Sequence, residues 1–483
     1  MTDVSPLSLA RRLLGILYGD GDRLMRIDNY LHGRHDDPYM PILADSEYRL
    51  LAARAISNWM PLLVGTPAQA MYVDGFRRGK SSGPKADQNL LESPEWDHWQ
   101  RSRMDARQAA VIRGALAYGH SFTVTLKDLR GKVSTKGLSA MKTAALFEDP
   151  ANDDTPYAAL TILSWANGET RGTATMWDDG FEYDVSFVAL GDPDGVRLLD
   201  VRSHGASECP VTRFAASVDL EGRTTGVIEP MIPLQNRINQ TVFDLLIAQT
   251  YGSFKVRYAT GMAPPLQRTP EGEVVLDELG QPKALAINAN AKRFLFADDP
   301  DVKFGSLDET PLGGYIESID MSIRHLAAVS QTPPHYLLGQ IANLSAEALT
   351  AAETALSRKV EEFRHAFGES WERVFRLAAE LSGIASSAED FHGEVIWRDM
   401  ESRSLAQSAD ALGKLALSLQ IPPRGLWSRV PDVTQTEIAE WHRLHEEDDS
   451  AGLLASSLTR ATAPTTKPSV VSTTSPGTPA AAK

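Results

Sequence analysis

A glycine-bounded segment in the first fifth of the chain comes close to a phosphate-binding loop. Residues 75–81 read Gly-Phe-Arg-Arg-Gly-Lys-Ser, and the strand-like residues 71–73 precede them. A P-loop has four residues between its glycines and a helix directly after the serine, so that backbone N–H groups point at the phosphates. Here three residues separate the glycines, and Ser-Gly-Pro follows at 82–84, where that helix must start. We therefore interpret the segment as a basic loop in solvent.

Two groups of histidines contain side chains that could bind a metal. His442 and His445 are three residues apart, which places them on one helix face, and the acidic residues 446–449 follow. His32 and His35 precede two aspartates. Neither group is accompanied by a second ligand pair, so an acidic helix end is the simpler interpretation. The single cysteine with scattered histidines forms no catalytic triad, and the sequence predicts no enzyme, no cofactor and no metal site.

Composition and charge narrow the class of protein. The chain has 483 residues, of which 42% are hydrophobic and 23% charged, which is ordinary for a globular protein of about three domains. Its formal net charge is −15. A protein that grips DNA through its phosphates has clustered Lys and Arg, and this sequence has no such cluster. The acidity is ordinary for keeping a protein in solution.

Targeting signals are not evident. The first residues lack a basic region, and Arg11 and Arg12 interrupt any apolar run, so no secretory signal is predicted. One cysteine, Cys209, excludes an internal disulfide framework and suits a reducing compartment. The uncharged stretch 56–73 reaches membrane length, but it contains two prolines. We expect a buried helix, a turn and a strand there, and no contact with a membrane.

Two helices of very unequal length are predicted between residues 310 and 383, joined by a loop that opens with two prolines. Thr310 and Pro311 are typical of a helix start, and apolar residues then recur at helical spacing to Leu326. Pro333 and the proline after it are expected to end this helix. The second helix is predicted over 345–383, roughly 55 Å long. Such a helix is typical of an element that spans a molecule.

The remaining segments give an order of helical and β-rich parts. An amphipathic helix is predicted near the N-terminus, a loop at 81–86 and helix over 87–120. Strands are predicted at 122–126, 158–162, 173–177, 181–188 and 196–201, because Gly/Asp/Asn turns separate them. A helix over 231–251 then precedes a small strand-and-loop unit at 252–303. Residues 400–449 read as helical, and the Thr/Pro/Ser/Ala-rich end from residue 462 is expected to be disordered.

The arrangement of short helix, double-proline loop and long helix resembles the portal proteins of tailed bacteriophages. Residues 329–339 and 343–349 are similar to the channel-loop region of that family. Further similar segments occur in the expected order over most of residues 10–445, namely 58–64 with 73–76, 96–124, 209–214 with 233–239, and 397–399 with 409–411 and 421–423. The chain most resembles portals of siphoviruses that infect actinobacteria.

The resemblance implies an α+β portal fold that forms a homo-oligomeric ring, usually of twelve subunits, at one capsid vertex. Viral double-stranded DNA would be packaged and ejected through it. Terminase and a head–tail adaptor would dock on it, and the major capsid and scaffolding proteins would be further partners. The virion, after assembly in the host cytoplasm, is the implied location. The implied parts are wing 1–228, stem helices 229–251 and 308–331, clip 252–307, channel loop 332–344, long wing helix 345–383, crown and C-terminal helices 384–460 and a disordered tail 461–483.

The channel loop supplies the predicted DNA-facing residues, which are Gln331, His335, Gln340 and Asn343. Neutral hydrogen-bonding side chains can touch passing phosphates without the counterion-release affinity that each Lys or Arg would add. Two alternatives remain at this point. Another structural neck protein of the virion would be shorter and lack the inserted β unit, and a DNA-processing enzyme would need an acidic metal cluster or a true P-loop.

Overall fold

The described part of the chain covers most of the sequence in separate segments. The computed structural model describes residues 5–40, 46–79, 94–128, 130–252, 257–260, 266–277, 280–283, 303–306, 311–339, 346–398, 405–430, 433, 437, 438, 440–445 and 447.

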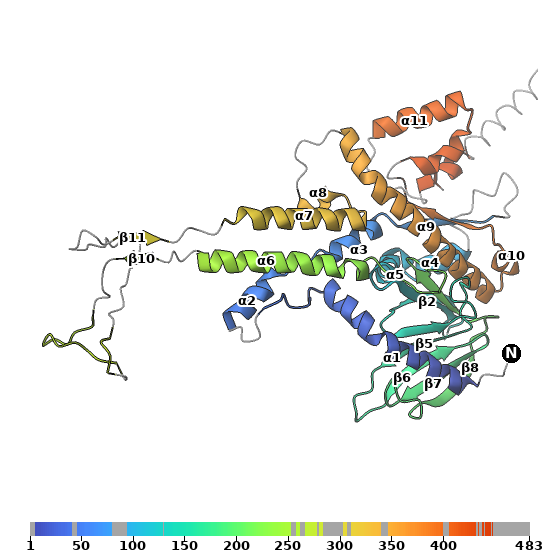
Figure 1. The fold of residues 1–483 in the computed structure, drawn as a ribbon. Helices are drawn as coiled ribbons and strands as arrows, with labels where there is room; N and C mark the ends of the chain where they lie inside the picture. Colours follow the sequence, from blue (N-terminus) through green and yellow to red (C-terminus); the bar gives the residue numbers. More distant parts are fainter. Residues whose placement is uncertain are drawn as a thin grey trace, which may run out of the picture.

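Two antiparallel sheets form the centre of the body (Figure 1). The first has the order β4-β5-β6-β7-β8, with strands Thr143–Leu146, Ala158–Ser164, Gly172–Trp177, Phe181–Phe187 and Arg197–Ser203. The second has the order β3-β2-β9, with strands Val133–Leu138, His120–Lys127 and Val211–Ala215. All five strands predicted from the sequence are confirmed, and β3, β4 and β9 are additional. The expected mixture of helix and sheet is confirmed as well.

Helices cover the outer face of each sheet. Helix α1 (Pro6–Leu31) begins at Ser5, whose side chain accepts a hydrogen bond from the backbone N–H of Ser8. Its leucines pack on the five-stranded sheet, where Leu160 and Met176 are fully buried. The opposite face of that sheet packs on the three-stranded sheet through Trp177. Because alternate residues of a strand face opposite sides, each sheet can bury apolar side chains on both faces.

An aromatic cluster joins the three-stranded sheet to the helices beyond it. Trp99 of α4 (Pro94–Arg101) lies 5.0 Å from Trp371 and 5.4 Å from Phe375 of α9 (Ala346–Ser382), measured between ring centroids. Phe214 of β9 lies 4.4 Å from Trp371. These aromatic side chains have no exposed surface, and edge-to-face and stacked pairs of this kind add to the stabilisation from burial. The C-terminal half of α9 is therefore the central helix of the body.

The expected single helix over 87–120 is divided. Helix α4 ends at Arg101, and α5 runs over Met104–Tyr118. Arg103 between them has a φ of 54°, a left-handed conformation that no α-helix can continue through. Residues 80–93, which include the predicted loop at 81–86, lie outside the described residues.

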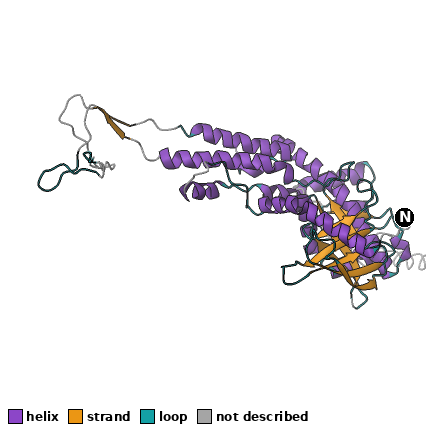
Figure 2. Ribbon diagram, turned by 60° about the horizontal axis from the view of Figure 1, so that its bottom comes forward, coloured by secondary structure: helices purple, strands orange, loops and turns teal. Residues whose placement is uncertain are grey.

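A pair of helices projects from the body (Figures 1 and 2). Helix α6 (Ile232–Gly252), preceded by the short η1 (Glu229–Met231), lies beside α7 (Gly313–Ser330). At the far end of the pair, β10 (Arg257–Thr260) runs antiparallel to β11 (Lys303–Ser306). The prediction of two helices with an inserted strand-containing unit is thus confirmed. The helix start does differ, because α7 begins at Gly313 rather than at Thr310, which lies outside the described residues.

The chain returns to its own beginning after α9. Strand β1 (Val73–Arg77) pairs antiparallel with β12 (Glu394–Trp397), although the two are more than 300 residues apart in sequence. The sequence had placed residue 384 onward among C-terminal helices, so this strand is a correction. The predicted helix and strand within 56–73 are confirmed as α3 (Met60–Gln69) and the start of β1.

The remaining helices are short or lie at the ends of the described chain. They are α2 (Ser46–Ala55), α8 (Pro334–Leu338), α10 (Ala385–Ala388), α11 (Leu405–Ser418) and η2 (Pro423–Arg429). The helical reading of 400–449 is confirmed for α11 and for the segment 440–445. The predicted disordered tail lies outside the described residues.

Candidate channel segment

The base of the projecting helix pair is held by amide side chains. Gln235 and Asn239 of α6 have 0% and 1% of their surface exposed. Gln235 Nε2 donates to the Ser57 carbonyl oxygen over 2.7 Å, and Asn239 Nδ2 contacts His35 Nδ1 over 2.9 Å. Buried amides without partners would cost free energy, so these bonds fix the angle at which α6 leaves the body. Glutamines and asparagines on this part of α6 therefore have a structural role.

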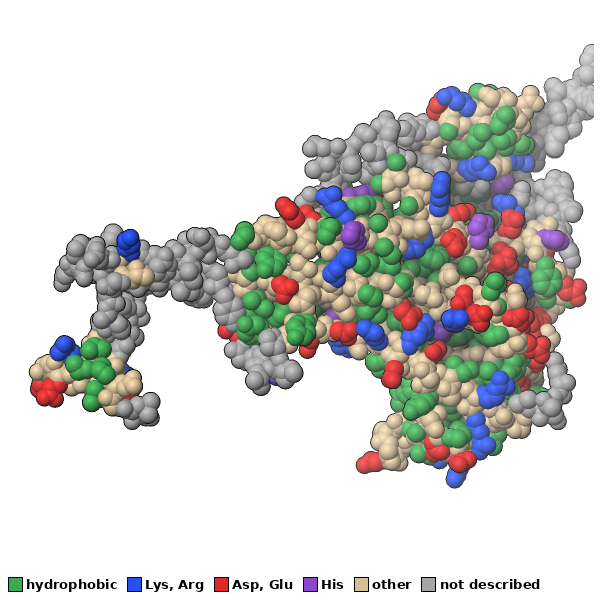
Figure 3. Space-filling model, viewed as in Figure 1, with side chains coloured by type: hydrophobic (Ala, Val, Ile, Leu, Met, Phe, Trp, Pro, Cys, Tyr) green, Lys and Arg blue, Asp and Glu red, His purple; other side chains and the backbone are tan. Residues whose placement is uncertain are grey.

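Few charges lie along α6. Arg237 and Asp244 are its charged residues. Arg237 Nη2 lies 3.0 Å from His325 Nδ1 of α7, which links the two helices. Apolar side chains of α7 remain uncovered in the single subunit, and Ile316 and Met321 each expose 53% of their surface. Figure 3 shows hydrophobic side chains along the projecting helices. Exposed apolar surface of this extent is typical of a contact with another chain.

The C-terminus of α7 is bound by a cation from the long helix. Lys359 Nζ of α9 donates to the carbonyl oxygen of Ser330 over 2.9 Å. Burial lowers the pKa of Lys359 below its ordinary value. A cation at a helix C-terminus interacts favourably with the unpaired carbonyl groups of the last turn. The contact therefore ties the inner end of α7 to α9.

Gln331 ends α7 in a left-handed conformation, with a φ of 54°, and its side chain is exposed. That Gln331 faces DNA stays a prediction. Pro333 and Pro334 follow, but the prolines do more than end α7, because Pro334 is the first residue of α8. Proline suits the first turn of a helix, where its missing N–H has no partner to lose. The predicted structureless loop thus begins with a helix of five residues.

His335 does not lie on the surface. It exposes 8% of its area, packs edge-on against Tyr336 at 4.5 Å between ring centroids, and its Nε2 lies 3.9 Å from Glu353 Oε1 of α9. Burial raises the pKa of the neighbouring Tyr336. The prediction that His335 faces DNA is therefore corrected, because α8 packs this side chain against α9. Gln340 and Asn343 lie outside the described residues.

The described part of residues 75–81 does not have the geometry of a phosphate-binding loop. Gly75 lies in β1, paired with Ile396, and the N–H of Gly79 donates to Asp390 Oδ2 over 2.9 Å. A backbone N–H that already binds a carboxylate is not available to a phosphate. Lys80 and the serine after it lie outside the described residues.

The histidines of both groups make contacts within the protein. His442 and His445 lie 4.8 and 6.0 Å from Trp427 between ring centroids. His35 stacks on Tyr30 at 4.6 Å, and His32 Nδ1 lies 2.9 Å from the Asp28 carbonyl oxygen. Over the segments that the structure describes, no three His, Cys, Asp or Glu side chains gather as a metal site would require.

The sequence reading missed Lys359 and the packing of α8. A lysine within an amphipathic helix carries no signal that distinguishes a cap on another helix from a solvated side chain.

Within the described ranges, no helix is both long and apolar enough to cross a membrane.

Comparisons with known proteins agree with this arrangement. The family described as "Phage portal protein, SPP1 Gp6-like" matches residues 20–451. The portal protein of Mycobacterium phage D29 is 26% identical over 411 residues, covering 81% of this chain and 79% of that protein. The portal protein of Mycobacterium phage L5 is 24% identical over 428 residues, with the same two shares.

Proposed function

The chain belongs to the SPP1 Gp6-like family of phage portal proteins, and from this premise we propose that twelve copies of it form a closed ring around a DNA channel. DNA packaging is the function of this family, and the chain is a portal protein of the virion capsid. The observation that carries the proposal is the family match over residues 20–451, which spans the body, the projecting helices and α9. The ring would be the path of viral double-stranded DNA during both packaging and ejection.

The projecting helix pair is our candidate for the stem, and the unit between α6 and α7 is our candidate for the clip. The exposed apolar side chains of α7 support this assignment, because neighbouring stems in a ring would cover them. The two sheets with α1, α5 and the C-terminal half of α9 correspond to the wing. The segment 405–447 corresponds to the crown and C-terminal helices.

The loop between α8 and α9 is our candidate for the narrowest part of the channel. Gln331 is exposed at its approach, and Gln340 and Asn343 offer neutral hydrogen-bonding groups further along. His335 is no longer included, since it is buried against α9. The net charge of −15 supports a channel wall that repels phosphates and lets the duplex slide.

Docking partners follow from the same assignment. Terminase during packaging and a head–tail adaptor afterwards would bind the clip, and the major capsid and scaffolding proteins would surround the wing. Assembly would take place in the host cytoplasm. We also infer that the purified protein neither hydrolyses ATP nor cuts DNA, because the N–H of Gly79 is already bound by Asp390 and no metal-binding cluster of side chains occurs among the described residues.

Electron microscopy of the purified protein tests the assembly directly. We expect rings with a central hole that admits duplex DNA, and subunit counting gives their number. A protein that stays a dispersed monomer at about micromolar concentration, also in the presence of scaffolding protein, would refute the proposal, since its apolar α7 surface would then be exposed in the functional state.

Charge in the loop tests the channel assignment separately. Gln340→Lys combined with Asn343→Lys should leave ring formation intact and slow packaging in a salt-dependent way, because each added cation gains phosphate contacts. Gln340→Ser with Asn343→Ser is the matched neutral control. Normal packaging rates of the lysine variant at every salt concentration would show that the loop does not meet DNA.

A further inference from the structure

A small hairpin presents a leucine to solvent on one side of the body. Residues 218–224 form this hairpin tip, closed by an antiparallel bridge between Val218 and Thr224. Leu220 at its end is 91% exposed. Asp219 Oδ1 accepts hydrogen bonds from the backbone N–H groups of Glu221 and Arg223 over 3.0 and 2.8 Å. These bonds define the turn, so Leu220 projects from a folded tip rather than from a loose strand.

The hairpin tip is fastened to the body. The Gly222 backbone lies so close to Pro150 that an added Cβ would stand 2.4 Å from the proline Cβ. At its base, Arg23 Nη2 donates to the Thr224 carbonyl oxygen over 2.9 Å. A fully exposed leucine on a fastened turn contributes little to the subunit that carries it. Its presence there is explained if another surface covers it.

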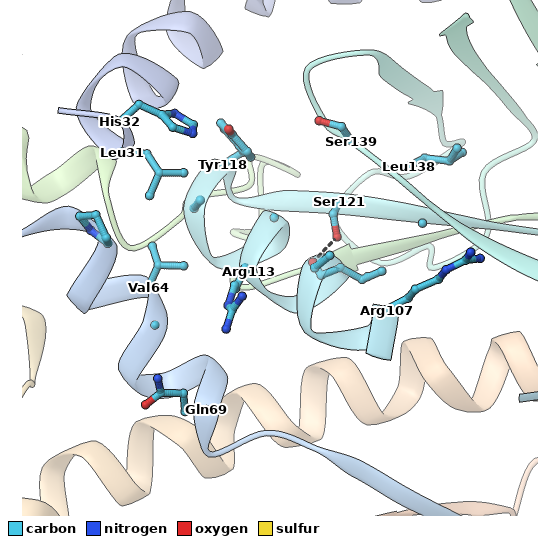
Figure 4. Close-up of a pocket in the computed structure, with 17 residues that line it drawn as sticks. Leu31, His32, Val64, Gln69, Arg107, Arg113, Tyr118, Ser121, Leu138 and Ser139 are labelled. Atoms are coloured by element: carbon cyan, nitrogen blue, oxygen red, sulfur yellow. Dashed lines mark hydrogen bonds between the residues drawn. The ribbon is translucent and has the colours of Figure 1, made fainter. Parts of the chain in front are cut away.

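A groove with a matching character runs along α5 (Figure 4). Its volume is about 790 Å³, and its walls come from α3, α5, the end of α1 and the end of β3. In Figure 4, Leu31 and Val64 lie on one side of α5 and Leu138 on the other. The small residues Ala110, Gly114 and Ala117 of α5 are part of the lining, and Ala110 is exposed to solvent.

The charges of groove and tip are opposite. Arg107 and Arg113 line the groove. Within the described residues, the side chain of Arg113 has no hydrogen bond or ion pair, and Arg107 Nη1 makes one long contact of 3.4 Å with the Ser102 carbonyl oxygen. The tip carries two acidic residues, and Glu221 has no cationic partner in the described part of the chain, whereas Asp219 pairs with Arg223 at 3.5 Å. Arginine can bind a carboxylate with two hydrogen bonds.

Tip and groove lie at opposite edges of the three-stranded sheet. In the order β3-β2-β9, the groove takes in Gly137 and Leu138 at the end of β3, and the tip follows directly after β9. A head-to-tail contact joins two different patches of identical chains, and it closes into a ring when the rotation between copies permits. The tip and the groove are two different patches of the subunit, as such a contact requires, and the base of the tip lies beside the start of β2, where Thr224 Oγ1 is 2.8 Å from His120 Nδ1.

We propose that the hairpin tip of one subunit inserts Leu220 into the α5 groove of the next subunit, with Glu221 facing Arg113. The occupant of the groove is therefore a second copy of this chain. The proposal rests on the ring proposed above and adds the contact that joins neighbouring wings.

Substitutions in the tip and the groove, followed by ring assembly, provide the first test. Leu220→Arg should raise the concentration needed for half-maximal ring assembly by at least about tenfold, because an apolar burial is lost and a cation meets two arginines. Leu163→Arg, at a leucine that is 62% exposed on another surface, is the matched control and should assemble normally. Glu221→Arg and Arg113→Glu should each weaken assembly, and the double variant should recover most of the loss, since contacting residues are energetically coupled.

Covalent trapping provides the second test and does not depend on the effect of any charge. Leu220→Cys combined with Ala110→Cys should give a ladder of disulfide-linked oligomers on oxidation, and either single variant should not. The native Cys209 is fully buried and does not compete.

The outcomes separate the two proposals. Wild-type protein that forms no ring refutes the proposed function. Wild-type rings with unchanged assembly of Leu220→Arg, no recovery in the exchanged pair and no ladder refute the tip-in-groove contact alone. Circular dichroism of each variant monomer checks that the subunit is folded. If Leu220→Arg fails this check, the cysteine pair decides.

Discussion

Replacement of His98 by glutamine should remove part of the acid sensitivity of the subunit. His98 lies between Trp96 and Trp99 in α4, exposes 2% of its surface, and its Nε2 lies 2.8 Å from Thr135 Oγ1. Burial, assisted by the positive charge of Arg101, lowers its pKa from 6.5 to about 4. The folded subunit therefore holds His98 neutral under conditions in which the unfolded chain protonates it.

The sign and size of the effect follow from proton linkage. Because the folded pKa is the lower one, the unfolded state binds more protons between the two values, and stability falls as pH falls. The contribution of His98 is complete above pH 6.5 and declines toward pH 4. With these values, about 2 kcal/mol is lost on going from neutral pH to about pH 5, and about 3 kcal/mol below both pKa values.

Urea unfolding, followed by tryptophan fluorescence at fixed protein concentration, measures this difference. His98→Gln keeps a hydrogen-bonding side chain but does not titrate, so its stability should fall less steeply between neutral pH and about pH 5, by about 2 kcal/mol. His365→Gln is the matched control, because the His365 side chain is 82% exposed and the same substitution there removes no buried group. Identical pH dependence of the wild type and His98→Gln would refute the argument that burial keeps this histidine neutral.

Two further substitutions test the body itself. Trp371→Ala removes a side chain with no exposed surface from the aromatic cluster, and it should lower the free energy of unfolding by about 3–5 kcal/mol in urea; a loss below about 1 kcal/mol would mean that the cluster is not packed as described. Arg78→Ala leaves Glu95 without the partner that now donates to it over 2.7 Å and that, against the effect of burial, holds the pKa of Glu95 below its ordinary value. This variant should be destabilised by about 3–5 kcal/mol, most of which Glu95→Gln restores in the double variant; equal stability of the single and double variants would contradict the ion-pair argument.

The elements readable from the sequence were those with local signals. Strands β5 to β8 were predicted because turns such as Asp178–Gly180 separate them, and α9 was predicted to within one residue at each end because its apolar spacing is uninterrupted. The break at Arg103 was not, since a left-handed arginine has no sequence signature. Likewise, the β1–β12 pairing joins residues more than 300 positions apart, which no local pattern encodes.

The candidate site was only partly predictable for the same reason. The exposed position of Gln331 follows from its place at a helix end, which the prolines mark. The burial of His335 follows from the packing of α8 on α7 and from its approach to Glu353 of α9, and these are tertiary contacts. The double proline was interpreted as the end of the first helix. Its second member, Pro334, also begins α8, which the preference of proline for the first helical turn could have indicated. The sequence did not single out Arg113 or Leu220, because the contact proposed for them is with a second subunit.

The late position of α9 in the chain has a consequence for synthesis on the ribosome. Trp99 emerges early, but its partner Trp371 lies 272 residues further along. At translation rates of about 5–20 residues per second, the apolar surfaces of α4 and α5 wait roughly 15 to 55 s for the helix that covers them. Nascent portal chains therefore expose an apolar surface for most of their synthesis. Host chaperones that bind nascent chains should accordingly set the yield of assembly-competent subunits, and a fragment that stops before α9 should aggregate.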